Sequence, residues 1–93
     1  MQDLTIDDFA PWVGGACDVT GPDGQVTMTL AAAEPLAGSP RAGGGFRLEF
    51  LGPREPLLGQ AIMSVTGPER TDEIFLVPVS RDDEGTLYEA VFF

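Results

Sequence analysis

The sequence predicts an all-β fold: a small six-stranded antiparallel barrel or sandwich with one short N-terminal helix. Two observations carry this prediction. From Ala16 onward, apolar and polar residues alternate with a period of two, in short segments separated by turns rich in Gly, Pro and Asp. No helical pattern recurs between these segments, so the βαβ rhythm of a parallel sheet is absent. At 93 residues the chain can form one compact domain, residues 1–93, with a modest core.

The first element is a short helix near the N-terminus. Apolar residues there follow helical spacing, at Ile6, Phe9, Ala10 and Val13. Thr5 is placed to cap the helix, and Asp8 follows three residues later. Pro11 would clash with the carbonyl four residues before it, so we expect the regular part to end near Ala10. Two turns at most should result, and they should plug one open end of the barrel.

Strands follow from Ala16 to the end of the chain. The segments with strand patterns are ACDVT, QVTMTLAAA, FRLEFLG, QAIMSVTG, EIFLVPVS and TLYEAVFF. The sequence GPDG predicts a tight turn after the first strand, and RDDEG predicts another before the last. The stretch from Glu34 to Gly45, rich in Gly and Pro, is predicted to be a long, flexible hairpin loop.

The segment IFLVPV differs from the other strands because both of its faces are apolar. Pro78 lies within it and cannot donate a hydrogen bond to a neighbouring strand. We therefore expect its nitrogen to point to an edge, a bulge or a barrel seam. One apolar face of this strand should be covered by the helix that carries Trp12, or by a partner.

The closing segment YEAVFF places Tyr88, Ala90 and Phe92 on one face, and Glu89, Val91 and Phe93 on the other. We expect residues 87–92 to pair with EIFLVPV across the RDDEG turn. Phe92 is then a core residue. Phe93 is either surplus or forms a contact surface with Val91.

The charge of the chain limits its partners. Fifteen carboxylates oppose five arginines, with no lysine or histidine, and the formal net charge is -10. Such a surface repels phosphate backbones and anionic lipid headgroups, so we expect neither nucleic acid nor membrane as a partner. The sequence also has no signal-peptide pattern and no long apolar run, which predicts a cytoplasmic protein or a component of a larger assembly.

The side chains give little support to catalysis. Without histidine, the commonest hydrolase and zinc-site arrangements cannot form, so we expect no enzyme, no catalytic residue, no metal and no cofactor. Cys17 alternates with Val19, which favours a buried small apolar residue over a nucleophile. In RDDEG, Asp82, Asp83 and Glu84 offer oxygen ligands, but their spacing does not fit a calcium loop, and a solvated turn is favoured.

The segments DFAPWVG, FRLEFLGP, IFLVPV and YEAVFF together resemble a family of small uncharacterised bacterial domains. Members typically have an LFLVPV-like strand and end in a YEAVFN-like strand. The resemblance implies the fold and carries no activity. It also implies a role in assembly, as an accessory to a phage-tail-like or fibre structure. This chain departs from the pattern at Phe93, where a polar residue is usual, and in QAIMSVTG, which lacks the usual aromatic.

Two classes of function follow from these observations. The first is a non-enzymatic protein-protein interaction or assembly module, bound to a protein partner or forming a homo-oligomer. The second is a small barrel that binds a ligand or a divalent cation. We favour the first because six strands with many large apolar residues should fill their own interior. The candidate interaction surface consists of Trp12, Pro78, Val91 and Phe93.

Overall fold

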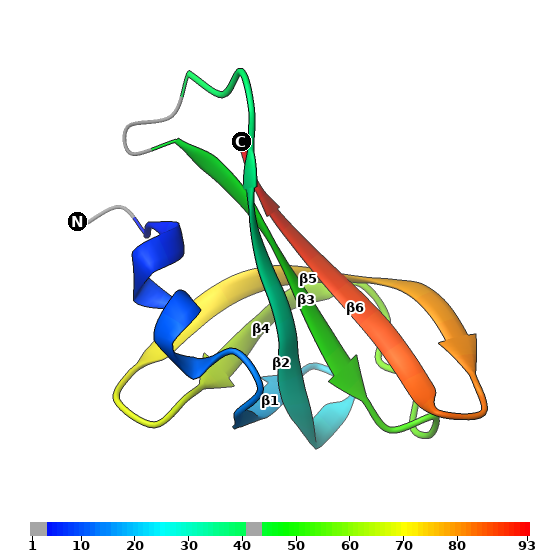
Figure 1. Ribbon diagram of the computed structural model, residues 1–93. Coiled ribbons are helices and arrows are strands. Elements are labelled where there is room, and N and C mark those ends of the chain that lie inside the picture. Colours follow the sequence, from blue (N-terminus) through cyan, green and yellow to red (C-terminus); the bar gives the residue numbers. More distant parts are fainter. Residues whose placement is uncertain (1–3, 41–43) are drawn as a thin grey trace.

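The computed structural model describes residues 4–40 and 44–93. Its six strands are antiparallel and form one sheet that closes on itself in the order β1-β2-β3-β6-β5-β4, a closed barrel (Figure 1). The predicted fold class is confirmed, and the alternative of a sandwich is not what forms. The strands are β1 (Ala16–Gly21), β2 (Gly24–Leu36), β3 (Gly45–Gly52), β4 (Ala61–Thr66), β5 (Thr71–Asp82) and β6 (Gly85–Phe92).

Both predicted tight turns form. Gly21 pairs with Gly24 at the end of β1, and Asp82 pairs with Gly85 between β5 and β6. In the second turn the backbone N–H of Glu84 donates to Asp82 Oδ1 at 2.8 Å, an Asx-type bond that stabilises the reversal. The RDDEG segment is therefore a hairpin turn, as its sequence indicates.

The predicted loop from Glu34 to Gly45 is shorter in the structure. β2 continues to Leu36, and its last residues pair with the start of β3, so that Glu34 lies opposite Arg47 and Leu36 opposite Gly45. A bulge at Ala31 allows this long strand to bend. Pro35 is tolerated here near the strand end. Residues 41–43, in the middle of the predicted loop, lie outside the described residues.

The interior of the barrel is filled by side chains from every strand. Alternate residues point inward and are almost completely buried, as the period-two pattern requires. Tyr88 also enters the core, and its hydroxyl accepts a hydrogen bond from the backbone N–H of Leu58 at 2.9 Å. This bond attaches the loop between β3 and β4 to the barrel. The largest buried side chains of the barrel wall are Phe46, Phe50, Met28, Leu30, Leu48, Met63, Ile74 and Leu76.

β5 pairs with two different strands along its length. Its first half, Thr71–Leu76, pairs with β4, whereas β6 pairs with Val77–Asp82. The expectation that residues 87–92 pair with EIFLVPV is correct at Val77 and Pro78, which lie opposite Glu89 and Tyr88. It is wrong for residues 73–76, because β5 and β6 diverge beyond Val77 and their ladder ends there. The ladder shifts register between Pro78 and Ser80, so the predicted bulge beside Pro78 is confirmed.

The predicted short N-terminal helix forms as two successive 3₁₀ turns, Ile6–Asp8 and Ala10–Trp12. Pro11 sits inside the second turn, where its missing N–H costs nothing because the first residues of a helical turn have no intrahelical acceptor. At three residues per turn, Ile6, Phe9 and Trp12 share one side. The predicted inward positions Ala10 and Val13 are exposed instead.

These turns cover the barrel end at which β5 and β6 separate. Figure 1 shows β2, β3 and β6 running together toward the C-terminus while β5 turns away across them. Phe9 is fully buried there, with ring centroids 5.9 Å from Phe46 and 6.3 Å from Phe92. Phe46 and Phe92 stack with centroids 4.4 Å apart. The prediction that the N-terminal element plugs an open end agrees with this packing.

The two terminal phenylalanines should differ sharply in their effect on stability. Phe92 packs against the core through Phe46 and Phe9, whereas Phe93 is 61% exposed. We expect Phe92→Ala to lower the free energy of unfolding by about 3 kcal/mol. Phe93→Ala should change it by less than about 0.5 kcal/mol. Urea denaturation of both variants measures this, and equal losses would mean that the inward face of β6 is assigned wrongly.

Candidate interaction surface

A row of apolar side chains lies on the outside of the barrel, on β4, β5 and β6. Ile62 and Phe75 are directly paired across β4 and β5 and are 66% and 52% exposed. Val77, two residues after Phe75, is half-buried on the same outer face. Val91, on β6, is 54% exposed. We call Ile62, Phe75, Val77 and Val91 the outer apolar strip.

Carboxylates flank this strip on both sides. Glu73 precedes Phe75 by two residues on the outer face of β5, and Ser64 donates a hydrogen bond of 2.7 Å to it from the neighbouring strand. Glu89 lies directly opposite Val77 on β6 and has Glu49 as its partner on β3. Ile62, Phe75 and Val77 therefore form an apolar centre between Glu73 and Glu89, and Val91 lies beyond Glu89 on the outer face of β6.

Arg47 lies beside Val91 but is already engaged by three glutamates. Its guanidinium is 2.8 Å from Glu34, 3.4 Å from Glu49 and 3.6 Å from Glu89. The hydrogen bond and charge of Arg47 hold the pKa of Glu34 below its ordinary value, and the same contact raises the pKa of Arg47. One positive charge among three negative ones leaves this margin acidic.

Two of the four predicted surface residues occupy this side of β6. Val91 belongs to the strip, and Phe93 follows the end of β6 with its side chain mostly exposed. Pro78 does not join them, because it pairs with the buried Tyr88 and so lies on the interior face, half-buried at the bulge. The predicted surface is therefore not one continuous patch.

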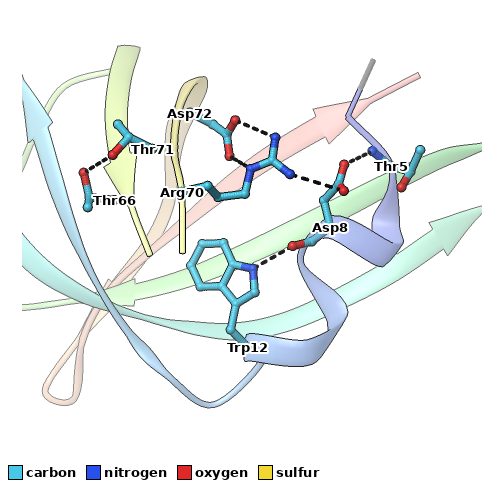
Figure 2. Close-up of polar contacts among 7 residues, drawn as sticks. All are labelled: Thr5, Asp8, Trp12, Thr66, Arg70, Thr71 and Asp72. Carbon is cyan, nitrogen blue, oxygen red and sulfur yellow. Dashed lines mark hydrogen bonds and ion pairs between the residues drawn. The ribbon is translucent and has the colours of Figure 1, made fainter. Parts of the chain in front are cut away.

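Trp12 lies at the barrel end and is held by a network of polar contacts (Figure 2). Its indole N–H donates to the backbone oxygen of Asp8 at 2.8 Å, and the Asp8 carboxylate accepts from the backbone N–H of Thr5 at 2.8 Å. Arg70 contacts Asp8 at 3.2 Å and Asp72 at 2.8 Å. This network joins the N-terminal turns to the hairpin between β4 and β5.

The Trp12 ring also packs against neighbours that leave it only partly accessible. Its centroid is 5.5 Å from that of Phe9. A Cβ atom placed on Gly67 would be only 2.9 Å from the indole, so the ring lies flat against the Gly67 backbone. These contacts agree with Trp12 as a lid on the core.

Shallow grooves lie on either side of Trp12. One, of about 220 Å³, is bounded by Asp7, Asp8, Pro11, Pro68, Glu69 and Arg70, and the other, of about 390 Å³, by Cys17, Asp18, Thr66 and Gly67 among others. The polar side chains of the first groove are largely engaged in the Asp8–Arg70 network. Both grooves lie outside the filled interior of the barrel.

Cys17 is buried between β1 and β2 and is not placed for reactivity. Its thiol contacts the backbone oxygen of Met28 at 3.5 Å. Burial raises the pKa of the Cys17 thiol from 9.0 to about 11, with a further contribution from the charge of Asp18. A protonated, buried thiol is a poor nucleophile, as the alternation with Val19 suggests.

The sequence analysis did not identify Ile62 and Phe75, the two large side chains of the outer apolar strip, as exposed residues. A signal for Phe75 exists, because IFLVPV is apolar on both faces and only one face can point inward. Ile62 alternates with buried Met63 and Val65, so it points outward. The predicted cover by the Trp12 segment is wrong for this face: the segment packs at the barrel end and leaves Phe75 half-exposed.

Most of the chain matches a known family. The family described as Domain of unknown function (DUF6916) matches residues 4–92. The chain belongs to this family. Neither a search of curated proteins nor a search of solved structures found a match. The expected resemblance to a family of small uncharacterised domains is confirmed.

Two further observations concern only the described residues. No three side chains from His, Cys, Asp or Glu gather there in a way that could hold a metal ion. No helix among residues 4–40 and 44–93 has the length and apolar character needed to cross a membrane.

A substitution at Gly67 tests the packing of Trp12. Gly67→Ala places a methyl group within about 2.9 Å of the indole, so the ring must move toward solvent. We expect a red shift of the fluorescence of Trp12, which is the single tryptophan of the chain. Gly59→Ala is the matched control, because its Cβ atom would be 3.4 Å from its one neighbour. An unchanged spectrum in Gly67→Ala would contradict the flat packing.

Cys17 should make stability depend on alkaline pH. Because its pKa is higher in the folded protein than its ordinary value of 9.0, the unfolded chain loses this proton first as the pH rises. The contribution of the protonated Cys17 thiol to the free energy of unfolding is complete below about pH 9 and is lost as the pH approaches about 11. The free energy of unfolding should therefore decline more steeply over this range in the wild type than in Cys17→Ala. Parallel declines in the two proteins would show that the thiol is not responsible.

Proposed function

We propose that this protein is a non-enzymatic protein-interaction module, which binds its partner through the outer apolar strip. The half-exposed Ile62–Phe75 pair is the observation that carries the proposal. Large apolar side chains grouped on one outer face, with charged residues around them, are typical of protein-binding surfaces. The filled interior supports the same conclusion, since a barrel of this size packed with its own side chains offers the outside for binding.

A place in a larger assembly is the biological setting that fits such a module. Closed barrels are rigid, so the strip is presented without the entropic cost of ordering a loop. The partner, on this proposal, packs side chains against a sheet face. Strand addition is the less suitable mode, because the sheet closes on itself and the exposed side chains that carry the proposal lie on a sheet face.

The proposal can be tested by photo-crosslinking. A benzophenone side chain at position 75 retains an aromatic ring and should crosslink the partner in a lysate of the source organism. Excess unlabelled wild-type protein should abolish the crosslinked product, whereas excess Ile62→Ser/Phe75→Ser should not. Val13→Ser/Leu57→Ser, which alters exposed apolar residues elsewhere, should compete as well as the wild type. Equal competition by both double variants would refute the proposed surface.

A further inference from the structure

We propose that the partner of the outer apolar strip is a cationic protein segment, in which apolar side chains are flanked by arginine or lysine. This inference rests on the proposed function and specifies the chemistry of the partner. It follows from the charges around the strip, from the state of the arginines and from the size of the apolar area.

Acidic side chains stand on the two sides where a partner must make its peripheral contacts. Glu73 adjoins Phe75 on β5, and Glu89 lies opposite Val77 with Glu49 beyond it on β3. Peripheral charges of a binding surface select the partner by complementarity and speed its approach. A partner with positive charges on both sides of an apolar centre matches this arrangement, whereas an acidic one is repelled.

The protein has little positive charge of its own with which to balance these carboxylates. Every arginine in the described part of the chain forms an ion pair with at least one acidic side chain. The pairs are Arg47 with Glu34, Glu49 and Glu89, Arg54 with Asp83, Arg70 with Asp8 and Asp72, and Arg81 with Glu55. With a formal net charge of -10, the surface attracts cations over a long range.

A second copy of this chain is a poor occupant of the strip. It would bring the same glutamates to the contact, so like charges would meet. The area is also small: four side chains at about 100 Å² each expose roughly 400 Å², whereas a stable dimer buries about 800 Å² on each partner. A short segment of a basic protein needs less area and supplies the missing charge.

The test uses a random linear peptide library displayed on phage. Biotinylated wild-type protein selects binders, and Ile62→Ser/Phe75→Ser, which has the same net charge, removes peptides that bind only through general electrostatics. We expect the remaining peptides to have a net positive charge, with apolar residues between the basic ones. The best of these should lose about tenfold in affinity when the salt concentration rises from about 0.05 M to about 0.5 M.

Paired charge variants then locate the contact. Glu73→Gln/Glu89→Gln removes two charges beside the strip, and Asp83→Asn/Glu84→Gln removes two at the β5–β6 turn. The first should weaken binding of the selected peptide about fivefold or more, and the second less than twofold. Circular dichroism confirms that each variant is folded.

The outcomes separate this inference from the proposed function. Strip-dependent peptides without a basic bias, or equal effects of the two charge variants, would overturn the cationic partner and leave the binding surface intact. A library that yields no strip-dependent peptide would overturn both. A wild-type dimer in sedimentation equilibrium that dissociates in Ile62→Ser/Phe75→Ser would replace the cationic segment with a second copy of the chain.

Discussion

The structure depends on how one strand, β5, is divided between two neighbours. Its first half pairs with β4 and its second half with β6, and this division closes the sheet. β4 and β6 lie at opposite edges of β5, and their two ladders are offset along the strand. The register shift between Pro78 and Ser80 marks a bulge, at which the strand bends. Proline is suited to the position because it has no N–H to lose from the ladder. Closure then leaves an opening at one end, where β5 and β6 separate.

The N-terminal segment fills that opening, and its local geometry follows from this task. Two 3₁₀ turns place residues three apart on one side, so Phe9 enters the core while Trp12 covers it from outside. The Asp8–Arg70 ion pair then joins the segment to the β4–β5 hairpin. An exposed ion pair adds only modest stability, so the buried aromatic cluster provides most of the attachment.

A closed and filled barrel also determines where binding can occur. Since alternate side chains occupy the interior, chemistry with a partner is left to the outward-facing residues of the same strands. Many of these are polar or acidic, and at the Ile62–Phe75 pair two large apolar side chains, 66% and 52% exposed, meet on the outside. The glutamates around it are not balanced by free arginines in the described part of the chain, because each arginine there is paired with a carboxylate. Surface charge and surface hydrophobicity thus point to the same face.

The sequence by itself determined the number of strands, the inward faces of the strands that alternate, and the positions of the tight turns. These properties are local: alternation with a period of two identifies the buried face of β6, and Pro22-Asp23 or Asp83-Glu84 reverses the chain wherever the strands end. The acidic surface and the buried state of Cys17 could be read in the same way.

Only the tertiary structure decided which strands pair and which apolar residues stay exposed. Two pairings join strands that are distant along the chain, β1 with β4 and β3 with β6, and closure of the barrel fixes them. The N-terminal spacing fits an α-helix and a 3₁₀ helix almost equally well over so few residues, and the opening beside Phe46 and Phe92 selected the second. The exposure of Phe75 depends on what covers its face. A sequence shows that a face is apolar, but the packing of the whole chain decides whether anything lies against it.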